Sequence, residues 1–236
     1  MARLQVAVAG ASGRMGTVAR EMLQHNGEYC CGLARVADPQ NEIVASLDEV
    51  FERNPDVLLD LTTQPGSFEI SLASVARGVP TVVGASGWTP EQRAALASMA
   101  GHRNTGALIV PNFSIGAMLM MRFAQEAARF FPNAEIIELH HAGKKDKPSG
   151  TARETALRIR QAGGEEPPIH SVRLPGLLAH QEVLFGATGE LLTIRHDSTT
   201  RDSFVNGMFA AVHAVTYMRG LVVGLDSVLD GTIGPK

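Results

Sequence analysis

A glycine-rich turn between an apolar run and a helical pattern constrains the fold of this chain most strongly. The run covers residues 4–9, the turn reads Gly10-Ala-Ser-Gly-Arg-Met-Gly16, and an amphipathic helical pattern follows. Glycines let a backbone turn tightly and approach a pyrophosphate, whose charge the positive end of the next helix attracts. The turn therefore predicts a dinucleotide-binding motif, spaced G-x-x-G-x-x-G because Ala11 replaces a glycine of the commoner pattern. The alternative is an ordinary strand-to-helix turn.

The rest of the first half alternates apolar runs with helical patterns. The runs cover residues 29–33, 56–61, 80–83 and 107–110, and Ser46 and Thr89 are expected to cap two of the helices. This alternation predicts an α/β fold with a Rossmann-type, doubly wound parallel sheet. Ligands of such sheets bind beyond the carboxyl ends of the strands. The loops at Gly10, Thr62, Gly84 and Asn112 should therefore share one edge.

The pattern changes after Ser114, which is expected to cap a long helix over residues 115–131. A strand over 134–139 and a helix ending near residue 161 follow, and then come extended segments at 169–174, 181–185 and 191–196. No helix separates the last two segments, so they are predicted to pair antiparallel. Met118, Met120 and Met121 have helical spacing and are read as core residues. We expect an α+β C-terminal domain with a mostly antiparallel or mixed sheet.

These patterns divide the chain into two predicted domains. Residues 1–113 form a dinucleotide-binding domain, and residues 114–208 form a substrate-binding and oligomerisation domain. A final helix is expected over residues 201–219 and an apolar tail over 222–229. Because a helix after the second domain can return to the first, residues 209–236 are assigned to the first domain.

Composition excludes several classes of protein. The net charge is −3, so general nucleic-acid binding, which needs a basic face, is not expected. No apolar run reaches the ~18 residues that span a bilayer, and the N-terminal residues lack the apolar core of a signal peptide. Cys30 and Cys31 are adjacent and are read as buried strand residues, not as a disulfide. We expect a soluble, cytoplasmic protein without a nucleic-acid or membrane partner.

A dense group of ionisable residues lies between Glu138 and Thr151. It contains two histidines and three lysines, namely His140, His141, Lys144, Lys145 and Lys147. Neighbouring ammonium groups favour release of a proton from one of them, and an imidazole can shuttle a proton near neutrality. Adjacent strand residues point to opposite faces, so the two imidazoles are poorly placed to bind one metal ion. We expect proton transfer here and no metal site; the alternative is a solvated basic loop.

A helix-start signal follows this cluster. Ser149 is a good N-cap, and the N–H groups of Gly150 and Thr151 with the threonine hydroxyl form an anion site the size of a carboxylate. The lysines nearby add positive charge. The stretch therefore favours a small anionic substrate.

The end of the second apolar run bears on the choice of cofactor. An acidic residue there would bind the ribose hydroxyls of NAD, but this chain has Ala34-Arg35. Arg35 can pair with a 2′-phosphate or stack on adenine; otherwise it is a solvated loop residue. The sequence favours NADPH and leaves NADH open.

The stretch from His140 to Ala152 resembles the H-H-x-x-K-x-D-x-P-S-G-T-A motif of the dihydrodipicolinate reductase (4-hydroxy-tetrahydrodipicolinate reductase) family. The glycine turn and the segments at residues 60–63, 84–87 and 111–114 follow in the family's order, so the resemblance covers essentially the whole chain. It implies NADH- or NADPH-dependent reduction of a small cyclic dicarboxylate, 4-hydroxy-tetrahydrodipicolinate, to tetrahydrodipicolinate in the diaminopimelate route to lysine. It also implies a homotetramer assembled through C-terminal sheets.

The resemblance also implies roles for individual residues. His140 and Lys144 are implied as catalytic proton carriers, and His141, Gly150 and Thr151 as contacts of the substrate carboxylates. The implied cofactor contacts are Gly10, Ala11, Ser12, Gly13, Arg14, Met15, Arg35, Gly84, Ala85, Ser86, Val110, Pro111, Asn112 and Phe113. The chain departs from the family where Ala34 replaces the acid that holds the ribose, and where Ala85-Ser86 replaces a common Thr-Thr pair.

Two other classes of function account for part of the sequence. A dinucleotide-binding sensor or regulatory subunit would use the first domain and leave the histidine–lysine cluster without a role. A semialdehyde dehydrogenase on the same scaffold needs an exposed nucleophilic cysteine, whereas Cys30 and Cys31 lie inside a predicted strand. Both classes rank below an NAD(P)H-dependent reductase.

Overall fold

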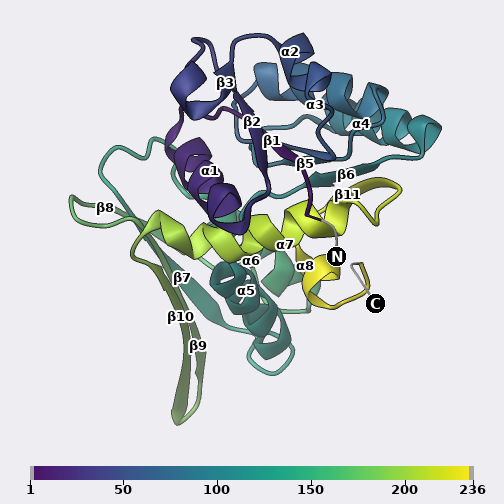
Figure 1. The fold of residues 1–236 in the computed structure, drawn as a ribbon. Coiled ribbons are helices and arrows are strands. Elements are labelled where there is room, and N and C mark those ends of the chain that lie inside the picture. Colours follow the sequence, from purple (N-terminus) through teal and green to yellow (C-terminus); the bar gives the residue numbers. More distant parts are fainter. Residues whose placement is uncertain (1–2, 234–236) are drawn as a thin grey trace. The chain divides into compact units, whose positions relative to one another are not determined.

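The computed structural model describes residues 3–233, which form two compact units. Unit 1 takes in the described residues up to Phe113 and those from Phe204 onward, and unit 2 is Ser114–Ser203. Figure 1 shows the elements of both units along the chain. None of the helices in the described part of the chain has the length and apolar character needed to cross a bilayer.

Unit 1 is built on a parallel sheet with the strand order β11-β6-β5-β4-β1-β2-β3. The strands are β1 (Val6–Ala9), β2 (Tyr29–Leu33), β3 (Ile43–Val44), β4 (Val57–Asp60), β5 (Thr81–Val83), β6 (Gly106–Ile109) and β11 (Gly220–Val223). The central strands β1, β4, β5 and β6 are buried along their whole length. Burial on both faces explains why these strands read as continuous apolar runs.

Helices cover both faces of this sheet (Figure 1). They are α1 (Arg14–Asn26), α2 (Leu47–Glu52), α3 (Gly66–Ala76), α4 (Pro90–Arg103), α7 (Val205–Val215) and the short α8 (Asp226–Leu229). The predicted caps are confirmed: Ser46 accepts the N–H of Asp48, and Thr89 forms a capping box with Gln92. Helices α1 and α7 contact each other, whereas α3 and α4 pack together in a separate apolar cluster. The Rossmann-type, doubly wound prediction is confirmed.

The end of unit 1 differs from the sequence-based expectation. The helix expected over residues 201–219 is a 3₁₀ turn followed by α7, which ends at Val215. The residues expected to be an apolar tail contribute to β11, which pairs parallel with β6. Gly106 makes this possible, because a side chain there would collide with the carbonyl of Val215 and with Met218. Four residues are too few to show a strand period, so this edge strand was missed.

Unit 2 contains a mixed sheet and two helices. Its strands are β7 (Ala134–His140), β8 (Ile169–Arg173), β9 (Ala179–Ala187) and β10 (Glu190–Ser198), in the order β10-β9-β7-β8. Only β7 and β8 pair parallel among the described strands of this sheet. The predicted antiparallel pair, β9 with β10, is confirmed, as is a mixed C-terminal sheet.

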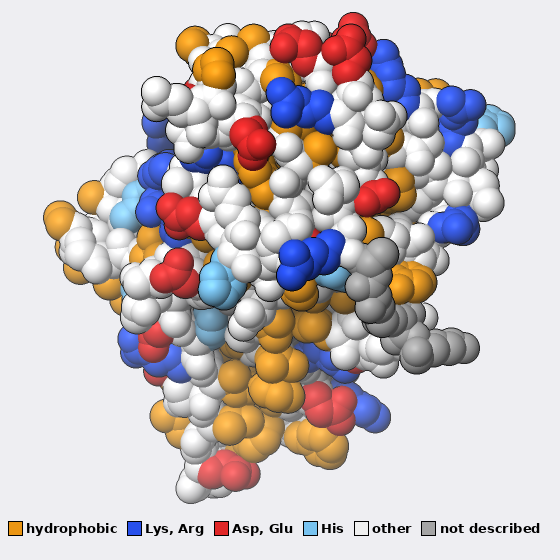
Figure 2. Space-filling model, viewed as in Figure 1, with side chains coloured by type: hydrophobic (Ala, Val, Ile, Leu, Met, Phe, Trp, Pro, Cys, Tyr) orange, Lys and Arg blue, Asp and Glu red, His pale blue; other side chains and the backbone are white. Residues whose placement is uncertain are grey.

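One face of the unit 2 sheet is covered and the other is open within the unit. The helices α5 (Ile115–Ala127) and α6 (Gly150–Gln161) pack on the covered face, where Ile136, Phe185 and Ile159 are fully buried. The three methionines of α5 are buried, as expected for core residues. The outer side of α5 instead exposes Leu119 and Phe123, and Phe130 is exposed in the turn after the helix. Figure 2 shows hydrophobic side chains gathered in this region.

Candidate active site

The turn after β1 is held in a conformation that requires glycine. Gly10 has φ +80°, and a Cβ there would lie 2.9 Å from the carbonyl of Leu61 at the end of β4. A Cβ on Gly16 would overlap the carbonyl of Gly10. The turn therefore lies directly against both β4 and the first turn of α1, which leaves backbone exposed beside the sheet edge.

Ala11 replaces the expected glycine without a clash, because the residue that faces its methyl group on β2 is itself a glycine. Ala11 is fully buried, and its methyl group faces Gly32 of β2, where any side chain would collide with it. Arg20 of α1 also donates from Nε to the carbonyl of Ala11 over 3.1 Å. These contacts fix the turn on its inner side.

The N-terminus of α1 is suited to bind an anion. Gly13 is the N-cap and supplies no side-chain cap, and the first turn contains no acidic residue. The first N–H groups of a helix have no partner inside the helix. Ser12, Gly13 and Arg14 are exposed and Met15 is half-buried. These residues fit the pyrophosphate of a dinucleotide.

The remaining predicted cofactor residues of the sheet reach the same edge. The amide of Gly84 donates to the carbonyl of Asp60 and that of Val110 to Val83, at 2.8 Å each. A Cβ on Gly84 would lie 2.8 Å from the Phe113 ring, so these two residues are packed together. Around them, Ala85 is buried, Ser86 and Pro111 are exposed, and Asn112 is half-buried. Arg35 is exposed two residues beyond the end of β2.

Asp60, for which no role was predicted, organises this edge from inside. Its carboxylate is fully buried. Oδ1 accepts the N–H and hydroxyl of Thr62 at 2.9 and 2.5 Å, and Oδ2 accepts the hydroxyls of Ser67 and Ser71 at 2.5 and 3.1 Å. Burial raises the pKa of Asp60, and these hydrogen bonds only partly oppose it. The residue ties the β4–α3 loop to the sheet.

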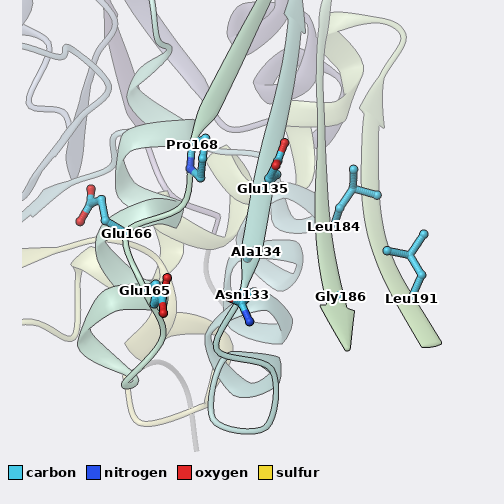
Figure 3. Close-up of a pocket in the computed structure, with 9 residues that line it drawn as sticks. All are labelled: Asn133, Ala134, Glu135, Glu165, Glu166, Pro168, Leu184, Gly186 and Leu191. Atoms are coloured by element: carbon cyan, nitrogen blue, oxygen red, sulfur yellow. The ribbon is translucent and has the colours of Figure 1, made fainter. Parts of the chain in front are cut away.

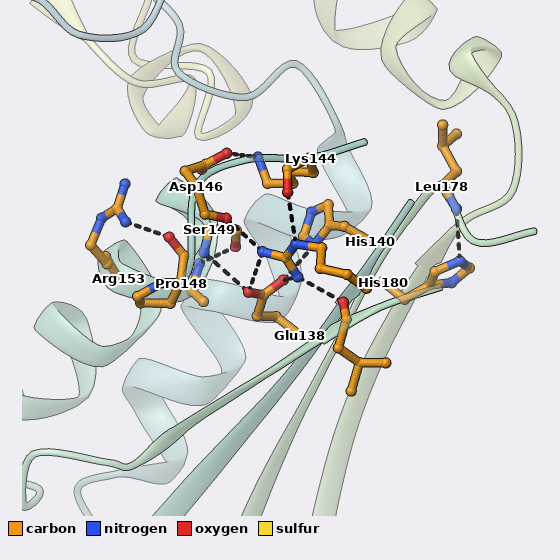
Figure 4. Close-up of polar contacts among 12 residues, drawn as sticks. Glu138, His140, Lys144, Asp146, Pro148, Ser149, Arg153, Leu178 and His180 are labelled. Carbon is orange, nitrogen blue, oxygen red and sulfur yellow. Dashed lines mark hydrogen bonds and ion pairs between the residues drawn. The ribbon is translucent and has the colours of Figure 1, made fainter. Parts of the chain in front are cut away.

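In unit 2, Glu138 and His140 lie on the covered face of β7, two residues apart. Glu138 Oε2 is 2.5 Å from His140 Nδ1 (Figure 4). The side chain of Glu138 is fully buried, and that of His140 is 13% exposed. The imidazole is therefore held from one side by a buried carboxylate, while part of the ring reaches the surface.

Arg173 completes the surroundings of this carboxylate. It stands beside His140 in the β7–β8 register. Its Nη1 and Nη2 donate to the two oxygens of Glu138 at 2.8 Å each. The same guanidinium donates to the carbonyls of Lys144 and Asp146 at 3.3 and 2.6 Å. One arginine thus joins β8, β7 and the loop that follows β7.

The charge states of Glu138 and His140 follow from these contacts. Burial raises the pKa of Glu138, but hydrogen bonds from Arg173, Ser171 and His140 outweigh it and hold that pKa below its ordinary value. Burial lowers the pKa of His140, and the bond to Glu138 and its charge offset this only in part. Near neutral pH the carboxylate is charged and the imidazole is neutral.

The other predicted residues of the cluster separate into two groups. Lys144 Nζ forms an ion pair of 2.8 Å with Asp146, while Lys145 and Lys147 are exposed. His141 is half-buried just after β7, with its ring near Gly143. Lys144 therefore lies close to the Glu138–Arg173 pair, whereas Lys145 and Lys147 face solvent.

The start of α6 is joined to the same network. Ser149 is the predicted N-cap and accepts the N–H of Ala152 over 3.1 Å. Its own N–H donates to Glu138 Oε1 over 3.2 Å. Gly150 is exposed and Thr151 half-buried in the first turn, which contains no acidic residue. The helix start, His140 and Lys144 thus share the partners Glu138 and Arg173.

No role in this site was predicted for Glu138, Asp146 or Arg173, although Asp146 is the aspartate of the motif and Glu138 begins the ionisable stretch. The spacing of Glu138 and His140 was a usable signal, because strand residues two apart share a face. The position of Arg173 depends on the pairing of β7 with β8, which no local pattern indicates. Within residues 3–233, no group of three or more histidine, cysteine or acidic side chains is placed to hold a metal ion.

A pocket of about 540 Å³ lies elsewhere in unit 2 (Figure 3). It is lined by Asn133, Ala134, Glu135, Glu165, Glu166, Pro168, Leu184, Gly186 and Leu191. Ala134 begins β7 and His140 ends it, so the pocket is at the opposite end of that strand from the imidazole. It contains none of the predicted site residues.

A dinucleotide-binding parallel sheet and a separate unit with a buried imidazole–carboxylate pair define a nucleotide-dependent oxidoreductase. Two family models match this chain: dihydrodipicolinate reductase, N-terminus, over residues 4–113, and dihydrodipicolinate reductase, C-terminus, over residues 116–229. The chain belongs to the dihydrodipicolinate reductase family. The resemblance noted in the sequence is confirmed.

Individual relatives match along almost the whole chain. The 4-hydroxy-tetrahydrodipicolinate reductase of Streptococcus suis (strain 05ZYH33) is 42% identical, over 96% of this chain and 99% of that protein. The enzyme of the same name from Cutibacterium acnes is 43% identical, over 96% and 98%. The solved structure of dipicolinate-bound dihydrodipicolinate reductase from Paenisporosarcina sp. TG-14 has a TM-score of 0.84 and 36% identity, covering 95% of this chain and 98% of that one.

Proposed function

We propose that this chain reduces 4-hydroxy-tetrahydrodipicolinate to tetrahydrodipicolinate with NAD(P)H, in the diaminopimelate route to lysine. The observation that carries the proposal is the group formed by His140, Lys144 and the start of α6, all joined to the buried Glu138–Arg173 pair. It provides two proton-carrying side chains beside an anion-binding helix start. Relatives that carry the name of this activity match 96% of the chain.

The cofactor would be held at the carboxyl edge of the unit 1 sheet. We assign its pyrophosphate to the turn from Gly10 to Met15, and the rest of its contacts to residues 84–86 and 110–113. Bound NAD(P)H supplies the hydride. Ala34 stands beyond β2 where NAD-specific sites place an acid, and the exposed Arg35 beside it favours the 2′-phosphate of NADPH.

The substrate is a small cyclic dicarboxylate, and unit 2 supplies groups for its charges. The N–H groups of Gly150 and Thr151 at the start of α6 would hold one carboxylate, since helix N-termini attract anions. His141, half-buried after β7, would contact the substrate as well. These assignments make unit 2 the substrate-binding domain.

Proton transfer is assigned to His140 and Lys144. The 4-hydroxyl group leaves as water, which creates a ring double bond; reduction then adds a hydride from NAD(P)H to one ring carbon and a proton to its neighbour, and Lys144 is the proposed donor of that proton. His140, neutral near pH 7 and hydrogen-bonded to Glu138, would exchange protons with the substrate or solvent. We place the reaction in the cytoplasm, where NADPH is supplied.

We also propose that the chain is a homotetramer assembled through the open face of the unit 2 sheet. That face carries apolar residues at alternate positions, namely Ile137, Leu139, Val172, Leu184 and Leu191. Leu191 is 68% exposed. The same face also carries the ion pairs His170–Glu135 and Arg195–Glu182. Apolar residues mixed with charged ones in this way are common in contacts between subunits.

Initial rates with each cofactor test the proposed function, with the unstable substrate generated in situ. We expect steady oxidation of NADPH, and a loss of kcat by a factor of roughly 10²–10⁴ in Lys144→Ala, as for a general acid, with the KM for NADPH unchanged. Lys145→Ala removes an exposed neighbouring charge and should keep the original kcat. Binding of NADPH without turnover would indicate a sensor, and normal turnover in Lys144→Ala would remove that lysine from the mechanism.

A further inference from the structure

The buried pair Glu138–Arg173 is more completely hydrogen-bonded than a surface ion pair. Glu138 Oε1 accepts from Arg173 Nη2 at 2.8 Å and from the Ser149 N–H at 3.2 Å. Oε2 accepts from Arg173 Nη1 at 2.8 Å and contacts His140 Nδ1 at 2.5 Å. Both side chains are almost entirely buried, at 0% and 6% exposure. Buried ion pairs contribute little net stability compared with apolar residues. Stability therefore does not explain why the Glu138–Arg173 pair lies beside the proposed proton carriers.

The contact with Glu138 determines the state of the imidazole. An ionised carboxylate only accepts hydrogen bonds, so a neutral His140 must carry its proton on Nδ1. Nε2 is then the nitrogen that accepts a proton. Because both oxygens of Glu138 are already held by Arg173, the carboxylate cannot turn away from the ring without breaking the pair.

Arg173 also acts on the segment that carries Lys144. Its Nε and Nη2 donate to the main-chain carbonyls of Lys144 and Asp146. The Lys144 side chain is in turn paired with Asp146 at 2.8 Å. The Arg173 guanidinium therefore fixes the position of the Lys144 backbone relative to the ring of His140.

We propose that Glu138 and Arg173 are positioning residues for proton transfer: Glu138 fixes His140 in the Nδ1–H tautomer, and Arg173 fixes both Glu138 and the loop that carries Lys144. The inference rests on the proposed function of His140 and Lys144. Neither residue contacts the substrate in this proposal, and each acts through a neighbour.

The charges around His140 give the direction of a pH effect. Glu138 faces the ring from β7, Arg173 from β8 and Lys144 from the loop. Of these three, only Glu138 raises the pKa of His140. Glu138→Gln should therefore move the limb of the kcat/KM profile that reports His140 to lower pH.

The test compares Glu138→Gln and Arg173→Lys with a matched control, Glu28→Gln. Glu28 contacts an imidazole too, that of His213 at 3.1 Å, and it precedes β2 at the opposite edge of the unit 1 sheet from the glycine turn. We expect the two site variants to lose kcat by roughly tenfold to a hundredfold with the KM for NADPH unchanged. The control should keep both kcat and the pH profile.

A measurement on the unsubstituted chain covers the case in which the variants do not fold. ¹⁵N NMR of the histidine side chains should show His140 protonated on Nδ1 at neutral pH, with the signal assigned by its loss in His140→Asn. An Nε2–H tautomer would overturn the proposal, as would a wild-type kcat and pH profile in Glu138→Gln. An unsubstituted chain that oxidises no NADPH would instead overturn the proposed function, and the positioning role with it.

Discussion

At the scale of single residues, buried polar groups hold loops of the structure in place. Asp60 has four hydrogen-bond donors around its carboxylate, all from backbone or hydroxyl groups. No ion pair of Asp60 occurs among the described residues. Its raised pKa means that the folded state holds the proton more tightly than the unfolded state does. Stability from this residue is therefore present below the unfolded pKa, about 4, and is lost as pH rises through the folded pKa.

Asp60→Asn tests whether the stability contributed by Asp60 falls as pH rises. Asparagine does not titrate, and it loses part of the hydrogen bonding, which costs about 1–3 kcal/mol at low pH. The difference in free energy of unfolding between the original chain and the variant should therefore shrink as pH rises from about 4 toward neutrality. Chemical denaturation at several pH values measures it. A difference that is constant, or that grows with pH, would contradict the raised pKa.

Gly16 offers a prediction about the cofactor site. In Gly16→Ala the new Cβ overlaps the carbonyl of Gly10, so the turn and α1 must move apart. We expect a loss of about 1–3 kcal/mol in stability and a weaker affinity for NADPH in a fluorescence titration. Gly101→Ala is the matched control in α4, because nothing lies within 4 Å of its Cβ. It should leave NADPH binding unchanged.

At the scale of elements, the start of α6 has two functions that a substitution can separate. Ser149→Ala removes the cap of Ala152 and should cost about 1 kcal/mol of stability. It also loosens the turn proposed to bind a carboxylate, so the KM for the substrate should rise. Thr89→Ala removes the equivalent cap of α4 and should cost similar stability at unchanged KM. A normal KM for the substrate in Ser149→Ala would show that the Ser149 cap is not needed for substrate binding.

Elements with long or repeated patterns were predictable from sequence, and those defined by pairing were not. The glycine turn, the caps at Ser46, Thr89 and Ser149, and the β9–β10 pair all have local signals. The edge strand β11 has four residues and joins β6 through contacts over a hundred positions away in the chain. Arg173 reaches Glu138 only because β8 pairs parallel with β7. Local propensity carries no information about such partners.

At the scale of the whole molecule, two surfaces of unit 2 that carry apolar side chains are candidates for the contact between subunits. One is the open sheet face that includes Leu184, and the other is the outer side of α5 with Leu119 and Phe123. They lie on opposite sides of the unit, because α5 packs on the covered face of the sheet. Apolar residues of the open face come from all four strands of the sheet, whereas the α5 surface is a single helix stripe.

The proposed tetramer therefore predicts different outcomes for the same change at two positions. Leu184→Lys places a charge in the open sheet face and should convert the tetramer to smaller species, since an unpaired charge is costly to bury in an interface. Leu119→Lys places the charge on α5 and should leave the molar mass unchanged. Light scattering after size-exclusion chromatography measures both. The reverse pattern would assign the contact to α5, and a monomeric original chain would contradict assembly altogether.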